Sequence, residues 1–487
     1  MAEAVDATLG ERAAQSPWVL EQRGLAESIA LLEQDLLAER ASMDDHVAHL
    51  ARPGLIPPLR AVHYFTALSA AQFGWVMRRL PADLTNGLRP LREPGAWLTE
   101  SVAYVLRDQL ALLGPAGAEL ARILDESEGL APSAMVDELR RRPLQSPPLP
   151  PPTVTRLLHR SFGGAIARTG EVVSATPISQ LHRGTLRDGR RVFIRVRRPE
   201  VGRVIRQDAR IGATLVGPLE WALPPVRDAH PLGFVELAAR QLLEEADLRN
   251  EALNAVELGL TIEALGVDYL VACRPVAGLV DPMAVVFEAP DEFEDAVLLA
   301  AGTDRVDGAA AMPAFARVTI EAALALGVFH ADLRPEQVLA LADGRAGLIG
   351  YSTIGRLDRR TRRAALDWVV AVFSGDAAGQ VEAMDEVGAI SERTDVKRLI
   401  SDLEGAESLQ PMALMAGGET ALMAAVQDGM RLFLRHRLRP PIELVLFVRT
   451  LLSLRALLRL VAPDRPITEA LLPLLPRLPE LRAQLAS

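Results

Sequence analysis

The spacing of apolar residues predicts a helical first part of the chain. Within residues 17–50, leucine and isoleucine recur at helical intervals among glutamate and arginine, which predicts an amphipathic helix. Residues 59–79 repeat this pattern with several aromatic residues, which we interpret as a packed core face. We therefore expect a helical extension over residues 1–94, followed over residues 95–168 by further helices and a proline-dense connector.

A strand pattern replaces the helical one in the middle of the chain. Apolar and polar residues alternate on both sides of Asp188-Gly189, a dipeptide that favours a tight hairpin turn. The first predicted strand leads into a loop of small residues at 174–177, and a later alternating run at 268–276 predicts a strand that leads into a hinge. We expect these strands to build a small lobe over residues 169–280.

Helical periodicity returns after the hairpin. Residues 201–221 and 232–260 each show the apolar spacing of a helix, and residues 359–486 are mostly helical with proline breaks. We expect a helix-rich second lobe over residues 281–487, which makes the chain an α+β protein.

Composition excludes several classes of protein. With 487 residues, 49% of them apolar, the chain is long enough for two or three lobes with their own cores. Its net charge of −10 gives no electrostatic support to nucleic-acid binding. The single cysteine, Cys273, excludes an intramolecular disulfide and a multi-cysteine metal site, which fits a reducing cytoplasm. Charged residues interrupt the apolar segment 441–461, so we expect no membrane span.

The most informative stretch covers residues 327–357. His330 and Asp332 lie in a predicted loop after an apolar helix, Gln337 follows five residues after the aspartate, and Gly350 follows an apolar strand. A loop aspartate, a metal ligand five residues later and a second ligand after a strand are the catalytic parts of a protein kinase. The stretch resembles that arrangement, but Gly350 has no side chain to offer a metal.

Further segments are similar, in order, to motifs of the UbiB/AarF family of atypical kinase-like proteins, which includes proteins that support ubiquinone biosynthesis. The resemblance covers roughly residues 95–470. It implies a protein-kinase-like bilobal fold with an N-terminal helical extension and a helix-rich C-lobe. The matching segments are ISQLHR at 178–183, RVRRP at 195–199, EADLRNEALN at 245–254, FHAD at 329–332 and LIGY at 348–351.

The resemblance implies a role for each matching position. Asp332 corresponds to the base that accepts a substrate proton, and His330 precedes it in the same motif. Glu119 and Arg122 stand where the family has a lid motif over the nucleotide pocket. The positions implied to contact nucleotide are Ser174, Ala175, Thr176, Arg195, Glu245 and Asp247.

Several positions depart from the family pattern. Arg195 replaces the lysine that pairs with nucleotide phosphates, and a guanidinium places its charge differently from a compact ammonium. Gln337 replaces a metal-binding asparagine and Gly350 a metal-binding aspartate, and Mg²⁺ requires such oxygen ligands in tight geometry. In the lid motif, Glu119 and Arg122 replace lysine and glutamine. We therefore expect no magnesium site, whereas ATP binding remains open.

These departures favour a pseudokinase, a kinase-like scaffold without metal-dependent phosphoryl transfer. We expect an accessory, scaffold or carrier protein in the biosynthesis of a lipophilic or isoprenoid-type metabolite. The alternative is an unconventional ATP-dependent enzyme, an ATPase or a phosphotransferase, that uses Asp332 as its base. In that case Asp343 or Glu336 recruits a metal, although Asp343 also fits a hairpin turn. Arg195 or Arg334 then holds the phosphates.

A third hypothesis is a protein that binds a lipid-like small molecule. The predicted helices at 59–79 and 441–461 offer apolar faces to a hydrophobic molecule or to a membrane surface. The expected partners are accordingly a biosynthetic enzyme or a hydrophobic small molecule, and not a nucleic acid. We expect a cytoplasmic location, with peripheral membrane contact under the third hypothesis.

Overall fold

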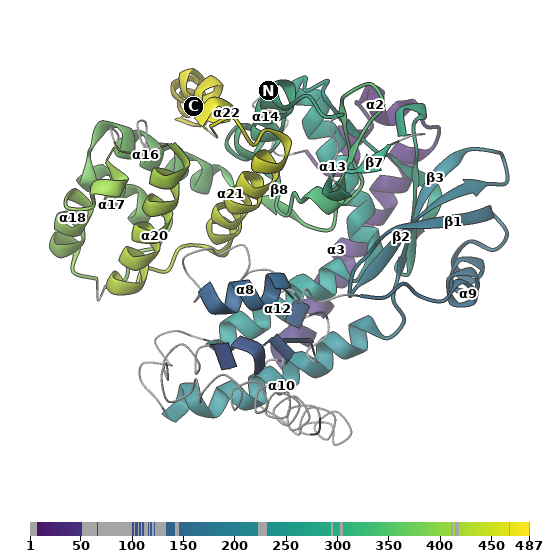
Figure 1. The fold of residues 1–487 in the computed structure, drawn as a ribbon, viewed down its shortest axis with the longest axis horizontal. Helices are drawn as coiled ribbons and strands as arrows, with labels where there is room; N and C mark the ends of the chain where they lie inside the picture. The colour runs from purple at the N-terminus through teal and green to yellow at the C-terminus, as the bar shows by residue number, and fades with distance from the viewer. Residues whose placement is uncertain are drawn as a thin grey trace, which may run out of the picture.

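The computed structural model has the expected α+β organisation, with a sheet-based lobe joined to a helix-rich lobe (Figure 1). The structure describes isolated positions between 66 and 121, residue 413, and residues 7–50, 133–141, 146–222, 231–293, 296–301, 305–392, 394–410, 418–466 and 468–486.

The small lobe is built on one five-stranded antiparallel sheet. The predicted hairpin joins its second and third strands, and Gly189 in the turn adopts a φ of 90°, which glycine tolerates best. One strand lies beyond residue 280, so the sheet extends past the expected boundary of the small lobe. The run at 268–276, predicted as one strand of this lobe, is divided: residues 270–272 pair in the sheet of the large lobe and residues 275–281 in this sheet. In sheet order the strands are β1 (Ile166–Ala175), β2 (Ser179–Leu186), β3 (Arg191–Arg197), β6 (Ala284–Glu288) and β5 (Pro275–Asp281).

The two faces of this sheet have different partners. Helix α9 (Pro151–Phe162) covers the outer face, where Val192 and Ile194 of β3 belong to one core with its apolar residues. Since side chains alternate along a strand, Phe193 and Arg195 point to the inner face, and Phe193 joins the main core. Pro151 begins α9, because the fixed φ of proline suits a first helical turn, so the proline-dense connector ends before this residue.

The helix predicted over residues 232–260 is wrong in one respect, because two helices occupy this region. The first ends at Glu245, and Asp247 caps the second by accepting a hydrogen bond from the backbone N of Arg249 at 3.1 Å. An aspartate at this position favours a helix start over helix continuation. The helices here are α10 (Val201–Ala222), α12 (Pro231–Glu245) and α13 (Leu248–Leu265).

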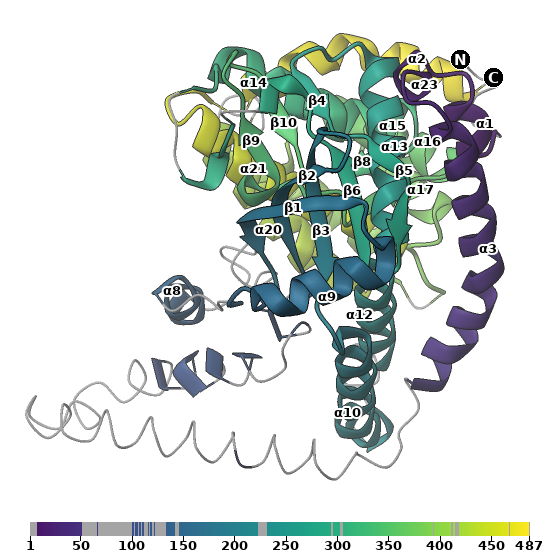
Figure 2. The same ribbon diagram turned by 90° about the vertical axis from the view of Figure 1, so that its right-hand side faces the viewer.

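The N-terminal helices pack against α13. Residues of α3 join Val256 and Leu260 of α13 in one apolar core, and Figure 2 shows α3 running along the side of the molecule. The predicted helix over residues 17–50 is interrupted at Gly24, which has a φ of 79°. The predicted helix at 59–79 lies almost wholly outside the described residues. The described helices are α1 (Leu9–Ala13), α2 (Pro17–Leu20), α3 (Leu25–Leu50) and α8 (Ser133–Arg141).

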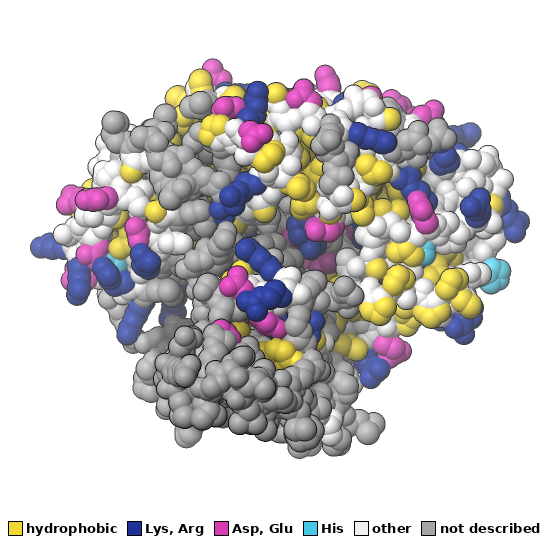
Figure 3. Space-filling view, viewed as in Figure 1, with side chains coloured by type: hydrophobic (Ala, Val, Ile, Leu, Met, Phe, Trp, Pro, Cys, Tyr) yellow, Lys and Arg dark blue, Asp and Glu magenta, His cyan; other side chains and the backbone are white. Residues whose placement is uncertain are grey.

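The large lobe combines short strands with many helices. A four-stranded sheet has the order β4-β10-β9-β7, and β11 pairs with β8. Within the part of the chain that is described, no helix is both long and apolar enough to cross a bilayer. Arginine and acidic side chains are interspersed on the described part of the face in Figure 3. The strands are β4 (Leu270–Ala272), β7 (Val297–Leu298), β8 (Val328–His330), β9 (Val338–Ala340), β10 (Ala346–Leu348) and β11 (Ile354–Arg356). The helices are α14 (Gly308–Ala316), α15 (Ala322–Ala325), α16 (Arg359–Ser374), α17 (Ala377–Glu386), α18 (Val396–Glu404), α20 (Gly418–His436), α21 (Ile442–Val461), α22 (Thr468–Leu471) and α23 (Leu478–Ala486).

Candidate functional site

A buried ion pair joins the sheet to α13. The Nε of Arg195 on β3 lies 2.8 Å from Oε1 of Glu251, and the two side chains are 8% and 4% exposed. In protein kinases a lysine on the same strand pairs with a glutamate of the neighbouring helix. Burial raises the pKa of the Glu251 carboxyl, and the charge of Arg195 opposes this shift. The ion pair of a kinase is therefore present here with arginine in place of lysine.

The guanidinium of Arg195 also reaches the large lobe. Its Nη2 donates to the carbonyl of Ile349 at 2.7 Å, one residue before Gly350. Its Nη1 lies 3.4 Å from Oγ of Ser179 on β2. The group that the resemblance implies for holding phosphates is thus bonded to oxygens of the chain itself.

Helix α13 holds the segment after β10 in place. Asn254 donates from Nδ2 to the carbonyl of Tyr351 at 2.9 Å, and the backbone N of Tyr351 donates to Glu251 at 3.3 Å. Farther along, Ile354 pairs with His330 in the β11–β8 ladder. Arg195 bonds the carbonyl of Ile349 before Gly350, and α13 bonds the backbone of Tyr351 after it, so the backbone is held on both sides of Gly350.

The side chain of Gln337 fills the space beside Gly350. A Cβ added at position 350 would lie 2.8 Å from both Cβ and Cδ of Gln337, and closer still to its Cγ. Interiors packed at crystal density have no spare room for such an atom. Gln337 is buried, and its Oε1 accepts a hydrogen bond from the backbone N of Arg334 at 3.3 Å. Positions 337 and 350 are therefore coupled by packing, because the side chain of Gln337 occupies the space that a side chain at position 350 would need.

His330 supports the same backbone. Its Nε2 donates to the carbonyl of Gly350 at 2.7 Å, and its Nδ1 accepts from the backbone N of Asp332 at 3.2 Å. These two bonds require one neutral tautomer with the proton on Nε2. Burial lowers the pKa of His330, which favours the same neutral form. The ring therefore orients the loop of Asp332.

The carboxylate of Asp332 lies between two arginines. Its Oδ2 is 2.9 Å from Nη2 of Arg334, and its Oδ1 is 3.8 Å from Nη2 of Arg449 on α21. Helix α21 contacts the loop a second time, where Thr450 donates to the carbonyl of Ala331 at 3.0 Å. The predicted base is thus 5% exposed and is covered by the late helix.

The small-residue loop between β1 and β2 is closed by its own hydrogen bonds. Ser174 and Ala175 end β1, and Oγ1 of Thr176 accepts from the backbone N of Ser179 at 3.1 Å. The carbonyl of Thr176 accepts from Nε of Arg198 at 2.7 Å. These bonds hold the loop as a short turn.

The remaining predicted nucleotide and lid positions are not brought together by the described residues. Asp247 caps α13 and pairs with Arg249, whose Nη2 lies 2.6 Å from its Oδ2. Glu245 ends α12 and is half-buried. Glu119 and Arg122 lie outside the described residues, so the roles predicted for them stay predictions.

Of the residues suggested for an unconventional enzyme, Arg334 pairs with Asp332, whereas the two suggested metal ligands, Asp343 and Glu336, belong to no cluster of acidic residues among the described ones that could hold a metal ion. Asp343 sits in the turn between β9 and β10, where it accepts a hydrogen bond from the backbone N of Arg345 at 3.0 Å. Glu336 is exposed in the short turn before β9. Asp343 therefore stabilises the turn of the β9–β10 hairpin, the alternative role that its sequence context also fits.

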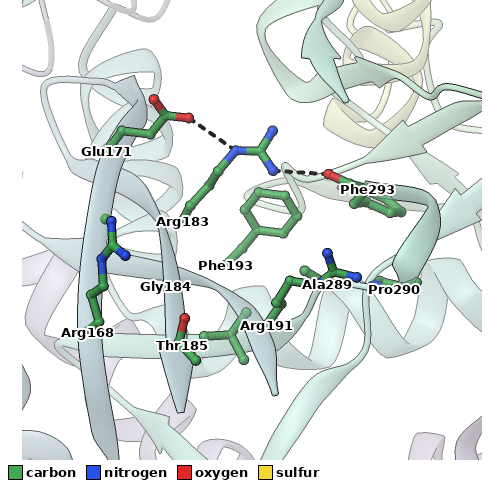
Figure 4. Close-up of a pocket in the computed structure, with 12 residues that line it drawn as sticks. Arg168, Glu171, Arg183, Gly184, Thr185, Arg191, Phe193, Ala289, Pro290 and Phe293 are labelled. Atoms are coloured by element: carbon green, nitrogen blue, oxygen red, sulfur yellow. Dashed lines mark hydrogen bonds and ion pairs between the residues drawn. The ribbon is translucent and has the colours of Figure 1, made fainter. Parts of the chain in front are cut away.

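Sequence reasoning missed the contribution of Phe193. Protein kinases have alanine two residues before the strand lysine, in the motif V-A-I-K, and this chain has VFIR at 192–195. The ring of Phe193 is buried on the inner face of β3 and meets Phe293 edge to face, with ring centroids 5.7 Å apart. The guanidinium of Arg183 lies 5.5 Å from the centre of the ring (Figure 4). The ring of Phe193 thus occupies the inner face of the sheet beside Arg195, at the position where a kinase has alanine.

We expect the stability of the fold to decrease as the pH falls below about 6.5, the ordinary pKa of histidine. Because burial lowers the pKa of His330, the unfolded chain takes up this proton at a higher pH than the folded chain does. The contribution of neutral His330 is complete above the unfolded pKa and is lost as the pH falls through the folded pKa. Urea unfolding at pH 7.5 and 5.5 measures the difference. His330→Gln, whose amide can still donate to Gly350, should lose less stability than the wild type, and equal losses would contradict this role.

Known proteins share this sequence pattern. The model of the ABC1 atypical kinase-like domain matches residues 146–384. An uncharacterized protein of Synechocystis sp. is 25% identical over 388 residues, which cover 76% of this chain and 93% of that protein.

Two further relatives carry more specific names. The chloroplastic Protein ACTIVITY OF BC1 COMPLEX KINASE 1 of Arabidopsis thaliana is 24% identical over 316 residues, which cover 62% of this chain and 45% of that protein. The Probable protein kinase UbiB of Marinobacter nauticus is 29% identical over 163 residues, which cover 32% of this chain and 30% of that protein. This chain thus spans less than half the length of each of these two. With the domain match and the kinase-like arrangement of Arg195 and Glu251, the chain belongs to the UbiB/AarF family of ABC1 atypical kinase-like proteins.

Proposed function

We propose that this protein is a pseudokinase, an accessory protein that does not carry out metal-dependent phosphoryl transfer. The observation that carries the proposal is the side chain of Gln337, which fills the space where a carboxylate at position 350 would lie. A kinase-like site needs that carboxylate for one of its magnesium ions. An octahedral oxygen site for Mg²⁺ has no room to form in this packing.

The surrounding contacts support the same proposal. The guanidinium of Arg195 is ion-paired with Glu251 and donates a hydrogen bond to the carbonyl of Ile349, so phosphate binding would have to disrupt these buried contacts. Phe193 adds a ring to the same face, and the carboxylate of Asp332 is paired with Arg334. Side chains of the protein thus occupy the regions of the catalytic base, the nucleotide phosphates and the metal ions in a kinase-like site.

The pathway is a further part of the proposal. We infer a scaffold or carrier role in the biosynthesis of a lipophilic or isoprenoid-type metabolite, because the chain is similar to a protein named as a probable UbiB kinase and to others of that family. Partners of matching chemistry are a biosynthetic enzyme or a hydrophobic small molecule. Co-purification followed by mass spectrometry separates them. A stoichiometric enzyme supports the scaffold role, and a bound lipid supports the carrier role. If neither an enzyme nor a lipid co-purifies, the pathway proposal is contradicted.

The test of the enzymatic part measures phosphate release from Mg-ATP. We expect no turnover by the wild type, and none that is robust by the triple variant Arg195→Lys, Gln337→Asn, Gly350→Asp, because Phe193 still occupies the inner face. Circular dichroism verifies that the variant is folded. Magnesium-dependent turnover by the wild type that is lost in Asp332→Ala would contradict the proposal. Strong turnover by the triple variant alone would show that only the phosphate and metal positions had changed.

A further inference from the structure

The first described residues of the chain lie along α13. Helices α1 and α2 contact α13, and Figure 2 shows them close to it. We call residues 8–22 the N-terminal strap. The match to the ABC1 domain begins at residue 146, so the strap lies outside it, and the match implies no role for the strap.

Trp18 attaches the strap to α13. Its ring lies against Gly259, where an added Cβ would be 2.8 Å from Cζ2 of the indole and closer still to Cη2. A larger residue at position 259 would therefore displace the ring. The guanidinium of Arg274 lies 5.9 Å from the centre of the Trp18 ring, and its Nη1 donates to the Trp18 carbonyl at 2.8 Å. The indole is thus held both by α13 and by Arg274, which directly precedes β5.

Hydrogen bonds hold the strap on either side of this tryptophan. Oγ of Ser16 donates to Glu263 of α13 at 2.6 Å. Oε1 of Gln22 accepts from the backbone N of Ala277 on β5 at 2.7 Å. The strap therefore joins α13 to the edge strand β5 of the small-lobe sheet.

Glu257 of α13 connects the strap to the large lobe. Its Oε1 lies 3.0 Å from Nη2 of Arg12 on α1, and its Oε2 pairs with Nη2 of Arg356 on β11. The side chain of Glu257 is 5% exposed, so its carboxylate depends on these guanidinium groups for counter-charge. One buried carboxylate thus serves both the strap and the segment after Gly350.

The same helix carries the other bonds that fix this segment. Glu251 accepts from the backbone N of Tyr351, and Asn254 donates to its carbonyl. Glu257 follows three residues later and pairs with Arg356. Side chains three residues apart are neighbours on a helix surface. A displacement of α13 therefore reaches residues 351–356 through three side chains.

We propose that the N-terminal strap is a regulatory clamp on α13, whose release is transmitted to residues 351–356. In protein kinases the position of the corresponding helix controls activity. Here the strap fixes that helix from outside the kinase-like site, and Glu257 joins the strap to β11. The inference goes beyond the pseudokinase proposal and does not rest on it, because the clamp acts on the helix whether or not a nucleotide binds.

Gly259→Ala releases the strap without changing a residue of the kinase-like site, because the added Cβ needs the space of the Trp18 ring. Hydrogen–deuterium exchange on the full chain measures the result. We expect exchange about five- to tenfold faster at Ala277, whose N–H is bonded to Gln22, and at residues 351–356.

Two variants control for other effects of an added methyl group. Gly429→Ala adds this group where a Cβ has no atom within 4 Å, and it should leave exchange at Ala277 and at residues 351–356 unchanged. Trp18→Leu combined with Gly259→Ala restores room between the strap and α13 and should recover most of the protection. Unchanged exchange at Ala277 in Gly259→Ala would overturn the proposal, and so would faster exchange there with residues 351–356 unchanged.

A double-mutant cycle of Arg12→Gln and Arg356→Gln, followed by urea unfolding, tests the role of Glu257. Either arginine alone still neutralises the buried carboxylate, whereas the loss of both leaves it unpaired. The unfolding equilibrium constant of the double variant should therefore exceed the product of the two single effects at least about fivefold. This excess should vanish in a Glu257→Gln background. It should also vanish when Arg23→Gln, a change of an exposed arginine just after the strap, replaces Arg12→Gln. A combined effect equal to or smaller than the product would overturn the proposal.

Discussion

Gly350→Asp is expected to destabilise the fold by about 3–5 kcal/mol, the range for an uncompensated buried charge. The new Cβ would lie 2.8 Å from Cβ and Cδ of Gln337, so overpacking adds to the cost. The guanidinium of Arg195, which donates to the neighbouring carbonyl of Ile349, is already paired with Glu251. Urea unfolding followed by circular dichroism measures this change in the free energy of unfolding.

Two controls separate packing from charge. Gly350→Ala keeps the steric conflict without the charge and should cost about 1–3 kcal/mol. Gly429→Asp places the same residue where an added Cβ has no atom within 4 Å, and it should cost little. In a Gln337→Ala background the loss from Gly350→Asp should shrink but persist, because Cβ of residue 337 remains. If Gly350→Asp is as stable as the wild type, Gln337 does not block position 350.

Glu251→Gln is expected to cost about 3–5 kcal/mol, because it leaves the guanidinium of Arg195 buried without its counter-charge. Arg195 is 8% exposed and donates to Ile349 of the large lobe, so its displacement should also loosen the contact between the lobes. Thermal unfolding and limited proteolysis measure the two effects.

The matching control is an exposed pair. Arg465 and Glu469 are 3.1 Å apart, with side chains 48% and 44% exposed, and Glu469→Gln should cost no more than about 1 kcal/mol. Replacing both members of the buried pair, as Arg195→Met with Glu251→Leu, should recover much of the stability, because paired apolar side chains carry no charge to desolvate. If Glu251→Gln and Glu469→Gln lower the free energy of unfolding by similarly small amounts, the buried pair contributes no more to stability than the exposed pair does.

Local sequence signals predicted the first strands of the small lobe and several turns, but not the division of residues 268–276 between β4 and β5. Asp188-Gly189 fixed the hairpin between β2 and β3, since this dipeptide favours one turn geometry. The order of motifs along the chain predicted the kinase-like fold, which the ABC1 domain match confirms. Each turn signal and each single motif consists of a few consecutive residues.

The contacts that fill the site could not be predicted in this way. Glu251 and Arg195 are 56 positions apart in the numbering, and only the crossing of α13 and β3 brings them together. Gln337 was expected as a replaced metal ligand, but its packing against Gly350 depends on how β9 and β10 pair. Asp247 lies in a stretch of helical periodicity, which conceals a cap between two helices.

The most direct test of the filled site is equilibrium titration of the wild-type chain with ATP in the presence of Mg²⁺. We predict no saturable binding at millimolar nucleotide, because Phe193, Arg195 and Gln337 occupy the regions that a kinase leaves open. One-to-one binding at micromolar ATP that requires Mg²⁺ and is lost on Arg195→Ala would contradict this central claim.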